Sequence, residues 1–173
     1  MSAQDSKLFV SSGPSGAGKG TLVTRVRERR SNLGLTVSAT TRAPRKGEVD
    51  GVNYFFLTRE EFDRRVANGE FVEWAEVHGN CYGTLVSEVQ SKLASGSSLI
   101  LEIDVQGALQ VKERFPEAVL IFIKPPSLEV LRERLVGRGT ETPETIELRM
   151  ANAADELALA DRYDDVVVND DLD

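Results

Sequence analysis

The sequence predicts an α/β fold in which a parallel sheet is flanked by helices. A glycine-rich loop at residues 13–21 stands between a short apolar run and a segment with helical spacing, and apolar runs alternate with helical segments between residues 86 and 123. Strands that alternate with helices are typical of parallel sheets. Hydrophobic residues make up 40% of the 173 positions, which is sufficient for one domain with a sizeable core.

The first half of the chain is expected to open the parallel core and then to leave it for a mixed insertion near residues 38 to 83. The sequence Thr58-Arg59-Glu60-Glu61 is typical of a capping box and marks the start of a helix in this insertion. The expected elements are, in order, a strand at Leu8–Val10, a helix containing Leu22 to Val26, an apolar segment at Leu35–Ala39, a polar binding loop at Thr40–Glu48, a short strand at Tyr54–Phe56, a helix from Thr58 to about Val66, a half-buried alternating strand at Phe71–Val77 and a turn at Gly79–Gly83.

The second half of the chain is expected to return to the parallel core. Glycines in Gly137–Thr140 interrupt the helical spacing, and Thr142-Pro143 supplies an N-cap and a first-turn proline for the next helix. A parallel sheet needs helical cover on both faces, so a final helix after Asp173 is also expected. The expected elements are helices at Val86–Ala94, Ala108–Phe115, Leu128–Val136 and Thr142 to about Leu159, and strands at Leu99–Ile103, Ala118–Ile123 and Val166–Val168.

Composition argues against several classes of function. The 21 basic and 28 acidic residues give a formal net charge of −7, which disfavours binding to nucleic acid or to an anionic membrane. One cysteine, Cys81, and one histidine, His78, provide neither a disulfide framework nor a zinc site. The polar N-terminus and the short apolar run after it predict no signal peptide, so the cytoplasm is the expected location.

The strongest local signal is the loop from Gly13 to Thr21. Gly13, four further residues and Gly18-Lys19 have the spacing of a phosphate-binding loop between a strand and a helix. In such a loop, backbone N–H groups and the helix N-terminus face phosphate oxygens, and the lysine reaches the β- and γ-phosphates. A helix-capping glycine turn is the alternative, but it needs neither the lysine nor this spacing. Gly20 stands where a Ser or Thr is usual, which leaves Thr21 as a substitute ligand for Mg²⁺.

A second group of polar residues is a candidate for binding another phosphate. Arg42 and Arg45 lie three positions apart in the polar loop, and Ser38 and Tyr54 are near them in the sequence. Two guanidinium groups and a phenol can clamp a phosphate through forked hydrogen bonds. Solvated surface arginines are the alternative, and without the phosphate loop they would be the better interpretation.

Glu73 is a candidate for recognising a nucleobase. It lies on the strand that leads into the turn before Thr84. A carboxylate accepts hydrogen bonds from the N1–H and the 2-amino group of guanine, a pair of donors that adenine lacks. A solvated strand carboxylate is the alternative interpretation.

Glu102 and Asp104 end a predicted strand and are two positions apart, so both side chains are expected on the same face of the sheet. Ligands of open parallel sheets bind outside the carboxyl ends of the strands. These acids are therefore candidates for holding the waters of Mg²⁺ or for contacting a base. An N-cap role for Asp104 is the alternative.

Three arginines are candidates for closing over a triphosphate. Arg134 and Arg138 lie four positions apart on one predicted helix face, and Arg149 lies on the next helix. The alternative is an ordinary surface with ion pairs, because Glu129, Glu133 and Glu141 are nearby.

Together these segments resemble the guanylate kinase family over nearly the whole chain. The matching segments are Gly13–Lys19, Ser38–Arg45, Glu73-Trp74, Tyr82–Thr84, the three arginines and Val168–Asp171. The resemblance implies a P-loop core domain at 1–37, 84–125 and 160–173, a GMP-binding subdomain at 38–83, and a helical lid region with arginines at 126–159.

The resemblance also implies an activity and its residues. The activity is transfer of the γ-phosphoryl group of ATP to GMP or dGMP, with Mg²⁺, in purine nucleotide metabolism. The implied catalytic residues are Lys19, Arg42, Arg134, Arg138 and Arg149. The implied ATP-binding residues are Gly13, Pro14, Ser15, Gly16, Ala17, Gly18, Lys19, Gly20, Thr21, Arg134, Arg138 and Asn169, with Asn169 on the adenine side. The implied GMP-binding residues are Ser38, Arg42, Arg45, Tyr54, Glu73, Tyr82, Thr84 and Asp104, and the metal would be held by Glu102 and Asp104 through water and by Thr21.

The chain departs from the family pattern at Gly20, where many members have Ser or Thr, and at Asp173, after which the family normally continues into a last helix. Two alternatives stay open at this point, a guanylate-kinase-like module that binds protein partners without turnover and a P-loop kinase for another monophosphate. The sequence also leaves open whether the protein is a monomer or a homo-oligomer.

Overall fold

The computed structural model describes residues 6–170 of the chain. Its centre is a five-stranded sheet in the order β2-β7-β1-β8-β9, and every neighbouring pair of strands is parallel. The prediction of a parallel sheet flanked by helices is confirmed. The expected helix after Asp173 and the family match at Asp171 lie outside the described residues. The strands of this sheet are β1 (Leu8–Ser12), β2 (Leu33–Gly34), β7 (Ser98–Glu102), β8 (Val119–Lys124) and β9 (Asp165–Val168).

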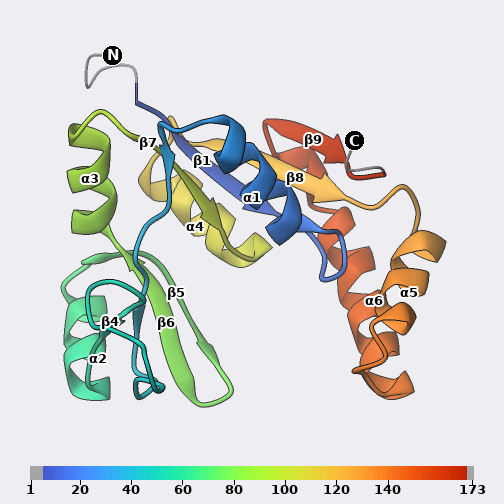
Figure 1. The fold of residues 1–173 in the computed structure, drawn as a ribbon, viewed down its shortest axis with the longest axis horizontal. Coiled ribbons are helices and arrows are strands. Elements are labelled where there is room, and N and C mark those ends of the chain that lie inside the picture. The colour runs from blue at the N-terminus through green and yellow to red at the C-terminus, as the bar shows by residue number, and fades with distance from the viewer. Residues whose placement is uncertain (1–5, 171–173) are drawn as a thin grey trace.

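Different helices cover the two faces of the core sheet. Leu8 and Val10 of β1 belong to the main cluster of buried residues, which includes side chains of α3 (Val86–Ala94) and α4 (Val105–Arg114). Helix α1 (Lys19–Arg29) lies on the opposite face of the sheet from α4 (Figure 1). That opposite face is only partly covered, because a groove of about 520 Å³ runs beside α1. Its apolar lining includes Phe9, Leu22, Val23, Val26, Ile100, Ile121, Ile123 and Val167.

The insertion forms a second, mixed sheet with the order β4-β3-β6-β5. Strands β3 and β4 are parallel, whereas β3 with β6 and β5 with β6 are antiparallel. Helix α2 (Arg59–Ala67) packs against this sheet through Phe62, whose ring centroid is 4.4 Å from that of Phe71. Thr58 caps α2 by accepting from the backbone N–H of Glu61, as the capping box predicts. The strands are β3 (Ala39–Thr40), β4 (Phe55–Phe56), β5 (Phe71–Val77) and β6 (Asn80–Leu85).

The predicted turn at Gly79–Gly83 is wrong, because β6 already begins at Asn80. His78 and Gly79 alone make the turn between β5 and β6, and their φ angles are +51° and +82°. Two central residues with positive φ are typical of the tightest hairpin turns. Gly83 lies inside β6, where a Cβ would be 2.7 Å from the Cδ1 atom of Phe71 and 2.8 Å from the carbonyl oxygen of Glu73. It serves close packing rather than a turn.

The predicted alternation of β5 is also wrong at its start. Phe71, Val72 and Glu73 are all buried, and the register against β6 shifts between Phe71 and Glu73. A bulge of this kind bends a strand and changes the direction of its side chains. Phe71 therefore joins the core of the insertion and Val72 joins the main core, while Glu73 is carried inward with them.

The C-terminal part contributes a helical arm and the last strand. Helices α5 (Leu128–Gly137) and α6 (Pro143–Leu157) pack on one another beside the phosphate-loop end of the core sheet (Figure 1). Their shared cluster of buried residues consists of Leu131, Leu135, Ile146 and Ala153. After α6, a 3₁₀ turn at Ala160–Arg162 leads into β9.

Helix α1 begins directly after Gly18 and contains the expected Leu22 to Val26. Two helix ends differ from the prediction. Helix α4 begins at Val105 instead of Ala108 because Asp104 caps it, and α6 ends at Leu157 instead of about Leu159. Among the described helices, none has both the length and the apolar character needed to cross a membrane.

Candidate active site

The loop between β1 and α1 presents backbone N–H groups at a helix start. Gly18 is the N-cap of α1 in the left-handed conformation, and no side chain caps the helix. The N–H groups of the first turn are therefore available to an anion, and the helix dipole favours negative charge there. A Cβ on Gly13 would lie 2.0 Å from the carbonyl oxygen of Ile123 on β8, so the loop can follow this path only with glycine at position 13.

Lys19 is the first residue of α1, and its ammonium group folds back to donate to the carbonyl oxygen of Gly13. Burial lowers the pKa of Lys19, while the negative charges of Glu156, Glu102 and Asp104 oppose that decrease. Burial in turn raises the pKa of Glu156. Carboxylates from α6, β7 and the start of α4 thus act on one lysine at the mouth of the loop.

Asn169, near the C-terminal end of the chain, binds the phosphate loop. It is buried, and its Nδ2 atom donates to the carbonyl oxygen of Ala17 over 2.7 Å. A Cβ on Gly18 would lie 2.5 Å from this Nδ2 atom, so the loop and the amide fit closely. The adenine contact expected for Asn169 stays a prediction, while its contact with the loop is a feature that the sequence did not indicate.

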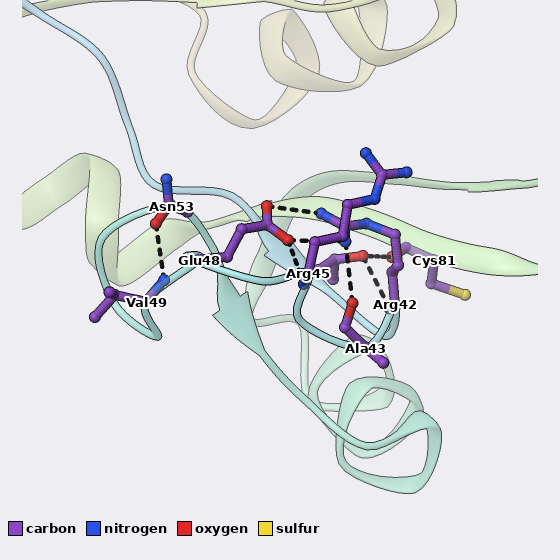
Figure 2. Close-up of polar contacts among 8 residues, drawn as sticks. Arg42, Ala43, Arg45, Glu48, Val49, Asn53 and Cys81 are labelled. Atoms are coloured by element: carbon purple, nitrogen blue, oxygen red, sulfur yellow. Dashed lines mark hydrogen bonds and ion pairs between the residues drawn. The ribbon is translucent and has the colours of Figure 1, made fainter.

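The polar loop after β3 holds an ion pair that the sequence analysis did not foresee (Figure 2). Both terminal nitrogens of Arg42 donate to Glu48, at 2.9 and 3.0 Å, and the backbone N–H of Arg45 donates to the same carboxylate at 2.7 Å. The hydrogen bonds from Arg42 lower the pKa of Glu48 to about 2, and the bond with Glu48 raises the pKa of Arg42. The guanidinium of Arg45 points away from Glu48 (Figure 2), so only the guanidinium of Arg42 binds this carboxylate.

Aromatic rings complete this loop. The guanidinium carbon of Arg42 lies 5.2 Å from the ring centroid of Tyr54, and Tyr54 meets Tyr82 edge-on at 6.3 Å. The sequence-predicted residues Arg42, Tyr54 and Tyr82 therefore lie together. The carbonyl oxygen of Ser38 accepts from the backbone N–H of Phe55, next to Tyr54, and Ser38 lines a small cavity of about 180 Å³ with Thr84 and Glu102.

Glu73 and Thr84 form a buried pair across β5 and β6. They are register partners, and the Thr84 hydroxyl donates to the Glu73 carboxylate over 2.8 Å. Glu73 is only 8% exposed, which contradicts the alternative of a solvated carboxylate. Burial raises the pKa of Glu73, and the bond from Thr84 opposes this increase. A Cβ on Gly107 of α4 would lie 3.2 Å from Glu73 Oε2 and 3.1 Å from Asp104 Oδ1, so both carboxylates approach the start of α4.

The two acids after β7 have different surroundings. The strand ends at Glu102, and Asp104 caps α4 by accepting from the backbone N–H of Gly107 over 2.7 Å. Strand alternation was expected to place the side chains of Glu102 and Asp104 on the same face of the sheet. This expectation is wrong, because Asp104 lies beyond the strand and has the N-cap role given as the alternative. Both carboxylates nevertheless act on the charge of Lys19.

The donor set around Gly20 fits a hydrated Mg²⁺. A Cβ on Gly20 would lie 3.5 Å from Glu102 Oε1, and Gly20, Thr21 and Glu102 line one open groove of about 700 Å³. Within residues 6–170, no cluster of three or more His, Cys, Asp and Glu side chains could hold a metal alone. Mg²⁺ takes one or two carboxylates besides waters and phosphates, so a single carboxylate beside the loop suits it.

Of the three predicted lid arginines, Arg149 contacts the phosphate loop and Arg134 contacts Asn169, the residue that donates to the loop. Arg134 donates to the carbonyl oxygen of Asn169 over 2.9 Å. Arg149 donates from Nη1 to the Ser15 hydroxyl over 2.6 Å, and its Nε atom lies 3.0 Å from Glu141 Oε1. Arg138 follows α5 as its C-cap and is exposed.

Sequence reasoning missed three carboxylates of the site. Glu48 is three positions after Arg45 in one loop, a spacing that indicates a local pair once the loop is known to turn. Glu156 is two helical turns after Arg149 on α6, so the helical period places both on the same side. Glu141 was counted as part of an ordinary charged surface, and no sequence signal separates it from its neighbours.

Comparison with known proteins identifies the family. The family model described as guanylate kinase matches residues 5–173. A guanylate kinase of Gloeobacter violaceus is 59% identical over 167 residues, 96% of this chain and 82% of that protein. A guanylate kinase of Halalkalibacterium halodurans is 54% identical over 172 residues, 99% of this chain and 84% of that protein. The crystal structure of guanylate kinase from Anaplasma phagocytophilum is 40% identical, with a TM-score of 0.66, over 96% of this chain and 77% of that one. With the phosphate loop, the buried Glu73–Thr84 pair and the arginine-bearing helices all in place, the chain belongs to the guanylate kinase family.

Proposed function

We propose that this chain transfers the γ-phosphoryl group of ATP to GMP or dGMP, giving ADP and GDP or dGDP, as a step of purine nucleotide metabolism. The observation that carries the proposal is the buried Glu73–Thr84 pair on the insertion, in the same molecule as a phosphate loop with its lysine. A carboxylate removed from water needs donors, and guanine supplies two adjacent ones. Thr84 and Asp104 complete the proposed contacts with the base.

The donor nucleotide is proposed to bind at the start of α1. The N–H groups of the loop receive the phosphates, and Lys19 leaves the carbonyl oxygen of Gly13 to meet the β- and γ-phosphates. Burial disfavours the charge of Lys19 in the free protein, so an arriving polyanion is a better partner for it than a neutral carbonyl. Asn169 keeps the loop in shape through Ala17.

The acceptor phosphate is proposed to bind at Ser38, Arg42, Arg45, Tyr54 and Tyr82. Arg42 is already oriented by Glu48 and by the Tyr54 ring, so little further ordering of its side chain is required. Arg45 contributes the guanidinium that points away from this ion pair (Figure 2). The phosphate then shares Arg42 with Glu48 or displaces it.

The reaction needs no general base from the protein. An oxygen of the GMP phosphate, already an anion near neutral pH, forms a bond to the γ-phosphorus, and the bond from that phosphorus to the β–γ bridging oxygen breaks. ADP leaves with the electron pair of that bond. Lys19 and the lid arginines Arg134, Arg138 and Arg149 stabilise the charge that develops, and alignment of the two nucleotides accounts for the remainder of the rate enhancement. Closure of α5 and α6 excludes water that would otherwise hydrolyse ATP.

Mg²⁺ is the proposed cofactor, and it would be held by Glu102 and Asp104 through water and by the hydroxyl of Thr21. When bound, it would neutralise negative charge on the phosphates of ATP.

A free, buried Cys81 supports a reducing compartment, and we place the reaction in the cytoplasm.

The test is an ADP-release assay with ATP and each of GMP, AMP, CMP and UMP. We expect turnover with GMP at a rate far above the other three, and loss of that turnover in Lys19→Ala with the fold retained. Tight ATP binding without turnover would instead indicate an interaction module, and equal rates with another monophosphate would indicate a different kinase. Either result would contradict the proposal.

A further inference from the structure

Arg149 is fixed at two corners of its guanidinium group. Nη1 donates to the hydroxyl of Ser15 in the phosphate loop over 2.6 Å, and Nε lies 3.0 Å from Glu141 Oε1 as an ion pair without the geometry of a hydrogen bond. Within the described residues, no bond is made by Nη2. One corner thus touches the loop, a second is held by a carboxylate, and the third is left for another acceptor.

Glu141 has an unusual setting for an acid at a helix–helix turn. It lies between α5 and α6, directly before the N-cap Thr142, and its side chain is only 11% exposed. Its Oε2 atom is buried and has no hydrogen-bond partner among the described residues. A buried carboxylate oxygen without a donor is costly, so its position calls for a reason beyond surface charge.

We propose that Glu141 is a positioning residue, which holds the guanidinium of Arg149 against the phosphate loop before the nucleotides arrive. The proposal rests on the function proposed above, in which Arg149 meets the transferred phosphoryl group. A carboxylate on Nε restricts rotation of the planar group, and this leaves Nη1 and Nη2 directed away from Glu141. Arg149 then needs only a short movement from Ser15 to the phosphates.

The same two helices provide a matched control. Arg132 of α5 pairs with Glu147 of α6, and both side chains are well exposed, at 46% and 63%. Neither residue contacts the phosphate loop. A change at Glu147 therefore removes an arginine–carboxylate pair between α5 and α6 without touching Arg149.

The experiment compares Glu141→Gln with Glu147→Gln in steady-state kinetics. Glutamine keeps the size of the side chain and removes its charge. We expect Glu141→Gln to lower kcat roughly 10- to 100-fold with little change in KM for GMP, because misplacing a charged group by an ångström has an effect of this order. Glu147→Gln should keep the wild-type kcat. Unfolding temperatures of both variants should lie close together, which separates positioning from a loss of fold.

A double-mutant cycle assigns the effect to Arg149. In an Arg149→Ala background, Glu141→Gln should cause no further loss of kcat, because its action passes through Arg149. A second readout is the affinity for a two-nucleotide inhibitor that spans both sites, which Glu141→Gln should weaken while the affinity for GMP alone is kept.

Three results would overturn the proposal: wild-type kcat in Glu141→Gln, an equal loss of kcat with and without Arg149, or wild-type kcat in Arg149→Ala. If Glu141→Gln does not fold, Arg149→Ala still tests the proposal, because wild-type kcat in that variant would overturn it. Failure of the proposed function would give a different result, because the wild-type protein itself would then produce no GDP.

Discussion

Glu73 shows how one buried carboxylate links recognition to stability. Burial raises its pKa above the ordinary value of 4.5, so the folded state binds this proton more tightly than the unfolded state does. The resulting stabilisation is fully present below the unfolded pKa and is lost as pH rises through the folded pKa. Glu73→Gln cannot ionise, so its stability relative to the wild type should increase from about pH 4.5 upward until Glu73 is fully ionised. Thermal unfolding across pH checks this, with the exposed Glu76→Gln on the same strand as control. A constant difference at all pH values would contradict the prediction.

The same residue should set the choice of base. AMP would place the N1 lone pair of adenine against Glu73 and leave the buried carboxylate without a donor from the base. GMP should therefore exceed AMP by roughly three orders of magnitude in kcat/KM, and Glu73→Gln should reduce this ratio mainly through GMP. Thr84 donates to Glu73 in the free protein, so its hydroxyl points toward the carboxylate that would bind the base. The measurement is kcat/KM for both nucleotides in both proteins, and an unchanged GMP to AMP ratio would count against base recognition by Glu73.

At the scale of single elements, strand β6 depends on a glycine that sequence patterns suggest is a turn residue. Gly83→Ala would place a Cβ 2.7 Å from Phe71 and 2.8 Å from a backbone oxygen, and overpacking of this kind typically costs about 1–3 kcal/mol. Gly137, the last residue of α5, has open space around a Cβ and no positive φ, so Gly137→Ala should be neutral or stabilise by about 0.4–1 kcal/mol. Denaturant unfolding of the two variants tests the contrast, which would be refuted by equal stabilities.

The elements also show where sequence reasoning succeeds and where it stops. Strands β7 and β8, helix α3 and the capped helix α2 were predicted within a few residues, because apolar runs and capping residues are local signals. The bulge at Val72 and the strand through Asn80–Gly83 were missed, since pairing of β5 with β6 decides both. In the same way, the position of Lys19 was predictable from the spacing within one loop. The carboxylates that act on the basic residues, Glu48, Glu141 and Glu156, could not be predicted, because turns and contacts between elements bring them into place.

For the whole molecule, the structure consists of three packed units, with the insertion and the helical arm at different ends of the main core (Figure 1). The main core, the insertion and the arm formed by α5 and α6 each have their own cluster of buried residues, and the cluster of the arm is small. Arg149 and Arg134 link the arm to Ser15 and Asn169 by polar contacts. An element held by few apolar contacts opens at a lower free energy than the core of the protein. The arm is therefore the part expected to move when nucleotides bind.

Hydrogen exchange should reveal this movement and the part that Arg138 plays in it. In the free protein, amides of α5 and α6 should exchange faster than those of β1 and β8, and a two-nucleotide inhibitor should protect the arm. Arg138 is exposed and follows α5, and we expect it to meet the phosphates when the arm closes. Arg138→Ala should therefore lower kcat roughly 100-fold, with a smaller effect on KM for GMP, because its contacts form in the closed, reacting state. The exchange protection that the inhibitor gives to α5 should also decrease in this variant, while that of β1 stays the same. Wild-type kcat together with wild-type protection in Arg138→Ala would show that the end of α5 is only a solvated surface.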